Sequence, residues 1–131
     1  MNERANSEHF NLKQRTKAFA LRIVKMYCAL PKRTESQVLG KQVLRSGTSV
    51  GANYCEADCA RSRAEFIAKM GDSLKELSET AYWLELLIEG GIVKSAKLEP
   101  LLKETRELIA IFATIITKTR HRNREALDIG H

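Results

Sequence analysis

The sequence GTSVG at residues 47–51 places a serine in the G-x-S-x-G pattern with which α/β-hydrolases expose a nucleophile. That pattern works only after a strand, with an acid and a histidine later in the chain. Here the flanking residues have helical periodicity, and the later histidines, His121 and His131, lie near the C-terminus. We therefore interpret Gly47 and Gly51 as a close helix contact of the G-x-x-x-G type and expect no enzymatic activity.

Cysteines and paired carboxylates offer little further chemistry. The cysteines are odd in number, and the i, i+4 spacing of Cys55 and Cys59 does not match the short paired spacings of zinc sites. We expect all three thiols, Cys28 included, to be reduced packing residues, and we expect no metal and no cofactor. Glu76 and Glu79 lack histidine or cysteine neighbours and indicate ion pairs on a helix face.

Polar residues with helical spacing form a stripe around these glycines. Its members are Gln42, Arg45, Ser46, Ser49, Asn53 and Glu56. Buried polar groups destabilise a fold unless they are hydrogen-bonded. The stripe is therefore either a satisfied network that fixes the register of the helices or a wetted surface that lines an assembly axis. A structural role is favoured over a ligand site, with Arg45, Lys75, Glu76 and Glu79 as the expected partners.

Basic residues gather at the two ends of the chain, which has a formal net charge of +6. The candidate nucleic-acid-binding residues are Lys118, Arg120, Arg122 and Arg124 near the C-terminus, and Lys13, Arg15 and Lys17 near the N-terminus. Cations at a helix C-terminus are also favoured by the helix dipole, so a solvated helix end is the alternative. Tyr82 and Trp83 are expected in a core or an interface, with base stacking as the alternative.

The elements that position these residues are predicted to be helices. Pro is rare, aromatic residues are 6%, and aliphatic and charged residues dominate. Apolar spacing of three and four predicts helices over about 12–30, 35–58, 63–89 and 97–121 in one domain, 1–131, with loose ends at 1–10 and 123–131. Capping boxes are predicted at Asn11, Thr34 and Ser62, and a C-cap at Gly90-Gly91.

The short connections predict an all-α, antiparallel, up-down-up-down four-helix bundle. The fourth helix carries a second apolar row, Leu101, Leu108, Ile111 and Ile115, beside its main seam. Two rows exceed what one small bundle covers, so we expect self-association. No apolar run is long enough to span a bilayer and no signal peptide is evident, so we expect a cytoplasmic protein without a membrane partner.

The sequence resembles the four-helix-bundle proteins encoded within 23S rRNA intervening sequences. The resemblance rests on the pattern Q-x-x-R-S-x-x-S-x-x-x-N-x-x-E, then E-F, then K-E-x-x-E-T-x-Y-W-L. The matching residues are Gln42, Arg45, Ser46, Ser49, Asn53, Glu56, Glu65, Phe66, Lys75, Glu76, Glu79, Thr80, Tyr82, Trp83 and Leu84. Many relatives have glycine after the motif glutamate where this chain has Ala57, which suggests a subgroup.

The resemblance implies a homopentamer and no established enzymatic activity. It also implies similarity to the accessory proteins of diversity-generating retroelements, which are basic pentameric bundles that bind nucleic acid and a reverse transcriptase. We therefore expect a non-catalytic oligomeric bundle that binds nucleic acid, especially structured RNA, through basic surfaces. The alternative is a protein-interaction scaffold or an accessory subunit for a partner such as a reverse transcriptase.

Overall fold

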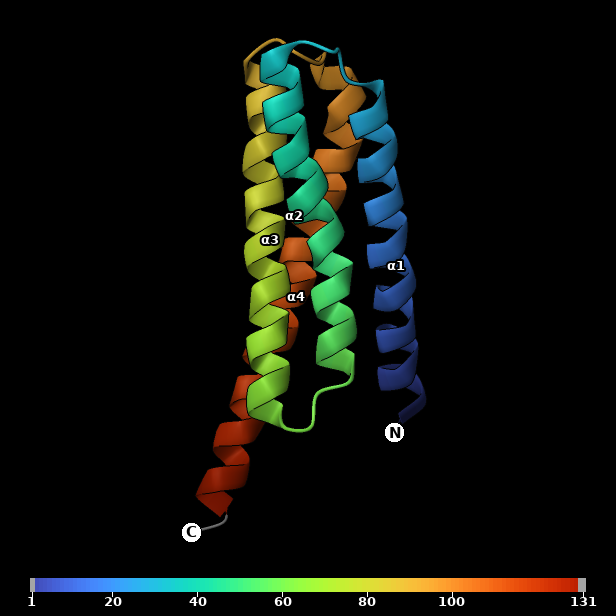
Figure 1. Ribbon diagram of the computed structural model, residues 1–131. Coiled ribbons are helices and arrows are strands. Elements are labelled where there is room, and N and C mark those ends of the chain that lie inside the picture. Colours follow the sequence, from blue (N-terminus) through green and yellow to red (C-terminus); the bar gives the residue numbers. More distant parts are fainter. Residues whose placement is uncertain (1, 130–131) are drawn as a thin grey trace.

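The computed structural model describes the backbone of residues 2–129 and the side chains of residues 11–122 and 124. Four helices account for nearly all of this part, and it contains no β-strand. They are α1 (Asn2–Ala29), α2 (Thr34–Asp58), α3 (Arg63–Glu89) and α4 (Ser95–Ile129). Figure 1 shows the helices side by side, joined by short loops, which confirms the prediction of an all-α chain with four helices. No helix in the described part is both long and apolar enough to cross a membrane.

Helix ends follow the predicted capping signals at some positions and depart from them at others. The Ser62 side chain accepts a hydrogen bond of 3.0 Å from the backbone N–H of Glu65 at the start of α3, and Gly90 caps its end. At α2 the N-cap is Arg33, which makes no side-chain cap bond. The capping box expected at Thr34 is therefore wrong, because the side-chain amide of Gln37 instead donates to the Pro31 carbonyl at 3.1 Å.

Both terminal helices are longer than the apolar periodicity predicted. Helix α1 begins at Asn2, so the capping box expected at Asn11 lies inside a helix, and α4 ends at Ile129. The predicted loose ends are thus largely helical, with residues 1, 130 and 131 outside the described part. The reason is that residues 2–11 and 119–129 contain no Gly or Pro and many good helix formers, and apolar periodicity reports burial rather than helix formation.

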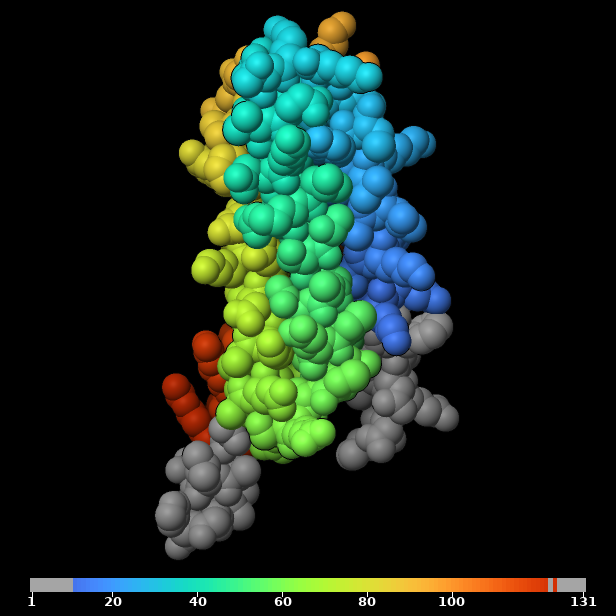
Figure 2. Space-filling model, in the orientation of Figure 1, coloured from blue at the N-terminus to red at the C-terminus, as the bar shows by residue number. Residues whose placement is uncertain are grey.

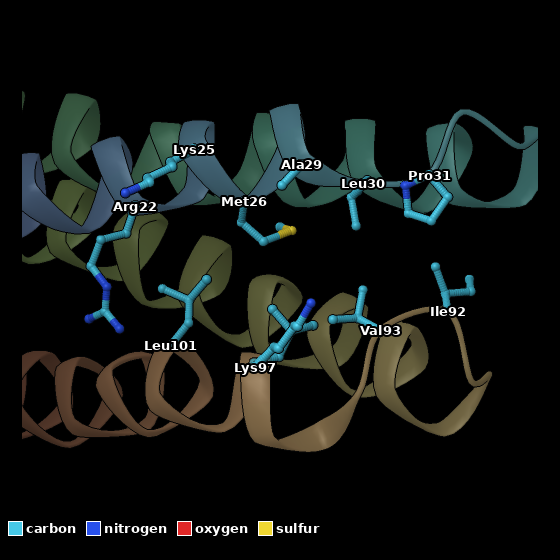
Figure 3. A pocket seen from close by; sticks show the side chains of 11 residues that line it. Arg22, Lys25, Met26, Ala29, Leu30, Pro31, Ile92, Val93, Lys97 and Leu101 are labelled. Carbon is cyan, nitrogen blue, oxygen red and sulfur yellow. The ribbon is translucent and has the colours of Figure 1, made fainter.

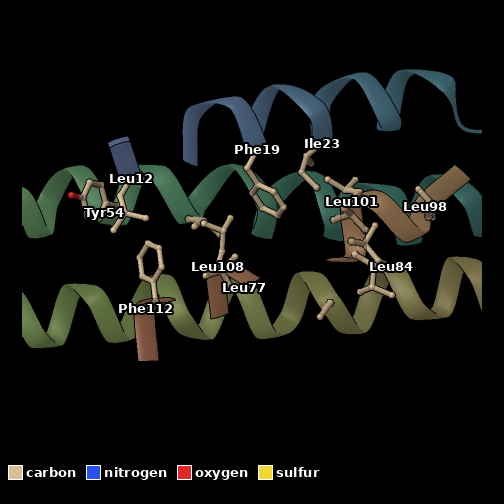
Figure 4. Close-up of a cluster of buried hydrophobic side chains, with 14 of the residues drawn as sticks. Leu12, Phe19, Ile23, Tyr54, Leu77, Leu84, Leu98, Leu101, Leu108 and Phe112 are labelled. Carbon is tan, nitrogen blue, oxygen red and sulfur yellow. The ribbon is translucent and has the colours of Figure 1, made fainter. Parts of the chain in front are cut away.

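The helices pack around one mainly aliphatic core that also holds buried aromatic rings. Tyr54 of α2 and Phe112 of α4 meet edge to face, with ring centroids 6.0 Å apart. Phe19 and Ile23 of α1 and Leu84 of α3 are also buried in this core, as Figure 4 shows. Contacts between α2 and α3 pair earlier residues of one helix with later residues of the other. The Ser46 hydroxyl contacts Thr80, and farther along α2 the Val50 carbonyl accepts a hydrogen bond from the Ser73 hydroxyl.

Helix α2 packs tightly against both α1 and α3, and in Figure 2 its side chains lie directly against theirs. Helices α1 and α4 approach each other much less closely. The second apolar row of α4 divides accordingly. Leu101 and Leu108 are buried in the core of the single chain, whereas Ile111 and Ile115 stay partly exposed beside α1. The row was therefore a weaker argument for self-association than the sequence indicated, because one bundle covers half of it.

Candidate nucleic-acid interface

The C-terminal part of α4 carries the densest group of exposed cations. Lys118, Arg120, Arg122 and Arg124 are all exposed, on the C-terminal turns of α4. Lys118 and Arg122 lie four residues apart and share one face, and Arg120 and Arg124 share another. Among the side chains that the structure describes, none of these four cations pairs with a carboxylate. We call these four residues the α4 basic end.

Helix α1 separates the three cations predicted near the N-terminus. Lys13 and Lys17 are exposed and share one face. Arg15 points instead toward α4, where its Nη2 atom lies 2.7 Å from Glu104 Oε1 and 2.8 Å from Glu107 Oε2, and its Nε donates to Glu104 Oε2 at 2.9 Å. This two-point contact is the strong form of an arginine–carboxylate pair.

The Arg15 contact changes the electrostatics of the α1–α4 seam. Hydrogen bonding to Arg15 holds the pKa of the partly buried Glu104 carboxyl below its ordinary value, and Glu104 raises the pKa of the Arg15 guanidinium. The charge of Arg15 is therefore compensated within the chain. The Arg15 side chain still lies close to the α4 basic end, because Arg15 and Lys118 line one hollow of about 390 Å³ together with Ile111 and Ile115.

The polar stripe of α2 faces α3. The Ser46 and Thr80 hydroxyls, both fully buried, share a hydrogen bond of 2.7 Å. Toward solvent, Arg45 Nη1 lies 3.1 Å from Glu76 Oε2, and Arg45 Nη2 lies 2.8 Å from Glu79 Oε2. The hydrogen bond from Arg45 lowers the pKa of the Glu79 carboxyl. The stripe thus has a buried edge with a satisfied hydroxyl pair and an exposed edge with an ion-pair cluster.

The remaining stripe residues lie toward its solvent side. Ser49 donates its hydroxyl hydrogen to the Arg45 carbonyl at 2.6 Å, inside a continuous helix, so the G-x-S-x-G sequence forms no strand-to-helix elbow. Glu56 is exposed and pairs with Lys69 of α3 at 2.8 Å. Gln42 and Asn53 are half-buried. Sequence reasoning named Glu76 and Glu79 as partners of the stripe but missed Lys69.

The glycines of α2 lie on the opposite side of the helix, against α1. A Cβ atom at Gly47 would come within 2.7 Å of Ile23 Cγ1. At Gly51 it would lie 3.2 Å from Thr16 Oγ1 and 3.6 Å from the Thr16 backbone carbonyl carbon. Gly40 lies on the same face of α2, and a Cβ atom there would come within 2.5 Å of Leu30 Cδ1. Helix α2 therefore packs its glycines against α1, and its serine hydroxyl forms a hydrogen bond with α3.

The thiols differ from their predicted places, whereas Trp83 packs against the core as predicted and Tyr82 is exposed. Cys28, Cys55 and Cys59 are free and exposed, so the prediction that they are packing residues is wrong; their positions fall on outward faces of α1 and α2. Tyr82 is exposed, and its ring meets the half-buried Trp83 ring edge to face at 5.0 Å. Within the described residues no three His, Cys, Asp or Glu side chains gather as a metal site would require.

Comparisons with known proteins agree with this architecture. A family model described as 23S rRNA-intervening sequence protein matches residues 8–114. A crystal structure from Bacteroides thetaiotaomicron, described as a protein with unknown function from the S23 ribosomal protein family, is 41% identical to this chain. It superposes with a TM-score of 0.78, over 83% of this chain and 97% of that one. No curated protein matches. Because the family model covers most of its length, the chain belongs to the 23S rRNA-intervening sequence protein family.

Proposed function

We propose that this protein is a non-catalytic bundle that binds structured RNA through the α4 basic end. The observation that carries the proposal is the group of four exposed cations, unpaired among the described side chains, on the C-terminal turns of α4. Affinity for a polyanion grows with the number of phosphates that a protein neutralises, and cations already paired within the chain add little. Lys13 and Lys17 are further exposed cations, on the side of α1 away from Arg15. Arg15 adds little, because Glu104 and Glu107 hold it.

We further propose an antiparallel up-down-up-down arrangement that assembles as a homopentamer. The opposed numbering of the α2–α3 contacts and the short loops support the arrangement. The partly exposed Ile111 and Ile115 support self-association, and the family resemblance supplies the number five. An assembly would present several basic ends at once. Light scattering tests this step, since a monomer at micromolar concentration would refute both the pentamer and the gain from multiplied charge.

RNA binding is testable through its salt dependence. At about 50 mM salt a folded RNA should bind, and the logarithm of the affinity should fall linearly with the logarithm of the salt concentration. The variant Lys118→Gln/Arg122→Gln should reduce the slope by about 1.4 to 1.8, the value for two lost phosphate contacts. The matched control is Lys41→Gln/Lys75→Gln, which removes the same charge from exposed positions of α2 and α3. Absent binding, salt-indifferent binding, or equal slopes in the two variants would exclude the proposed interface.

A protein-interaction scaffold is the second candidate. It is favoured by large apolar side chains that stay exposed, namely Leu21, at 61% exposure, and Val24 on α1, Val38 on α2 and Tyr82 on α3. Exposed apolar side chains of this size are typical of protein-binding surfaces when they gather in patches. Co-purification from the native host separates the candidates. A stoichiometric protein partner that remains after nuclease treatment favours the scaffold.

A further inference from the structure

A second hollow lies at the opposite end of the α1–α4 seam from the α4 basic end. Its volume is about 500 Å³. Helix α1 forms one wall and the start of α4 the other, and the α1–α2 and α3–α4 loops close the end, as Figure 3 shows. Volumes of this order are typical of sites for small organic ligands. We call this hollow the loop-end pocket.

The floor of the loop-end pocket is apolar. Leu30, Leu98 and Leu101 lie at its base with exposures of 6%, 3% and 4%. The half-buried Met26 side chain points into the gap from α1, and the half-buried Val93 side chain points into it from the α3–α4 loop (Figure 3). This surface would gain free energy from contact with a hydrocarbon, roughly 25 cal/mol for each Å² removed from water. The leucine and valine side chains of this floor carry no hydrogen-bonding group for a bare phosphate or a sugar.

The rim of the loop-end pocket is positive. Arg22, Lys25 and Lys97 line it, no acidic side chain does, and none of the three has a carboxylate within ion-pairing distance among the described side chains. Glu104, the acid whose pKa Arg22 helps to lower, lies outside the lining and is held by Arg15. Arg22 and Lys97 extend between the two helices, whereas Lys25 runs along α1 (Figure 3). An anion at the rim would therefore meet several cations with little internal competition.

We propose that the loop-end pocket binds a single-chain anionic amphiphile, a long-chain carboxylate. The hydrocarbon chain lies on the leucine floor and the carboxylate meets Arg22 and Lys97 at the rim. The hollow beside Lys118 also combines cations with apolar side chains, but Leu12 is its one buried leucine, and its arginine, Arg15, is held by Glu104. The loop-end pocket differs in its floor of three buried leucines and in rim cations without a carboxylate partner among the described side chains. The two sites lie at opposite ends of the bundle, so the inference does not depend on RNA binding.

The ligand class is tested with three probes on the full chain. Decanoate, below its micellar concentration, carries both features; 1-decanol carries only the chain, and acetate only the charge. Amide chemical shifts should move on decanoate addition at Ala29, Val93 and Leu101, which line the pocket. Decanol and acetate should each bind at least tenfold more weakly. No shift with decanoate at millimolar concentration, or equal binding of decanol, would overturn the proposal.

Variants place the binding in this pocket. Arg22→Gln/Lys97→Gln removes the two exposed rim cations that meet the carboxylate and should weaken decanoate binding about five- to tenfold, the usual effect of two partly screened ion pairs. Lys41→Gln/Lys75→Gln is again the matched control and should leave the affinity unchanged. Ala29→Trp fills the hollow from an exposed position and should abolish binding without unfolding the chain. Unchanged affinity in Ala29→Trp would place the ligand elsewhere. Absent decanoate shifts, together with an assembly that dissociates in the Ala29→Trp variant, would mean that a second copy of the chain covers the pocket, which also overturns the proposal.

Discussion

Replacing Gly47 with alanine should destabilise the protein, whereas the same replacement at Gly71 should stabilise it. Both glycines lie inside helices, where alanine is favoured by about 1 kcal/mol. A Cβ atom at Gly71 meets nothing within 4 Å, so this gain should appear in full. At Gly47 the new Cβ would lie 2.7, 3.0 and 3.1 Å from Ile23 Cγ1, Cγ2 and Cδ1.

The cost at Gly47 follows from the position of its neighbour. Ile23 is completely buried, so it cannot turn outward to make room. Inserting a methyl group into such a contact costs about 1–3 kcal/mol. After subtraction of the helix-propensity gain, the net effect of Gly47→Ala is a loss of about 0–2 kcal/mol. The two alanine variants should therefore differ by about 1–3 kcal/mol in the free energy of unfolding, and Gly47→Leu should disrupt folding outright.

Urea denaturation at one fixed protein concentration measures this difference, since any assembly makes stability concentration-dependent. A double-mutant cycle with Ile23→Ala identifies the contact. Ile23→Ala alone should lower the free energy of unfolding by about 2–5 kcal/mol. In the Gly47→Ala background the loss should be smaller, because the new methyl group fills part of the space. The coupling free energy between the two substitutions should therefore be favourable by about 1 kcal/mol or more. If Gly47→Ala and Gly71→Ala stabilise the protein equally, or if the cycle shows no coupling, the close-packing explanation of Gly47 is wrong.

Two further predictions concern the α2–α3 contact. Thr80→Val removes the 2.7 Å partner of the buried Ser46 hydroxyl, which keeps the longer 3.4 Å bond to the Val43 carbonyl, and it also removes the bond from Thr80 to the Glu76 carbonyl. The variant should cost about 1–3 kcal/mol, and adding Ser46→Ala should restore part of the loss. An additive double variant in urea denaturation would contradict this. Arg45→Met should cost about 0.2–1 kcal/mol at pH 7, because the pair with Glu79 is largely exposed. Arg45 lowers the Glu79 pKa in the folded state, so the pair's contribution is full above the ordinary value of 4.5 and fades as the pH falls through the lowered pKa. Thermal unfolding from pH 7 to pH 3 should show the two proteins converging, and a constant gap would exclude this origin.

The sequence predicts some helix ends well because local residues determine them. The bounds expected for the third helix, 63–89, coincide with those of α3, where Ser62 and Gly90 act directly as caps. Thr34 carries the same kind of signal but lies one residue inside α2, because the adjoining loop offers Gln37 the Pro31 carbonyl instead. A capping motif identifies residues that are able to cap a helix, and whether they do so depends on the tertiary contacts of the adjoining loop.

Features that depend on helices distant in sequence were harder to predict. The partners of Arg45 were foreseen, since consecutive helices with a short loop must lie side by side. The bridge from Arg15 to Glu104 was not, because those residues are 89 positions apart. The loop-end pocket has the same origin, since its walls come from α1 and α4 and its volume depends on how far apart the two helices lie.

The distribution of contacts around the bundle suggests where ligands would bind. Helix α2 is fixed on both sides, by glycines against α1 and by paired hydroxyls against α3, so these two seams leave little room for a ligand. The α1–α4 seam is held open, bridged at its middle by Arg15, with a hollow on either side of that bridge. Each hollow combines apolar side chains with cations. The hollow lined by Arg15 is continuous with the α4 basic end through Lys118, whereas the loop-end pocket is closed by loops. Binding at the two ends can therefore be tested separately in one protein, by changing cations on opposite sides of Arg15.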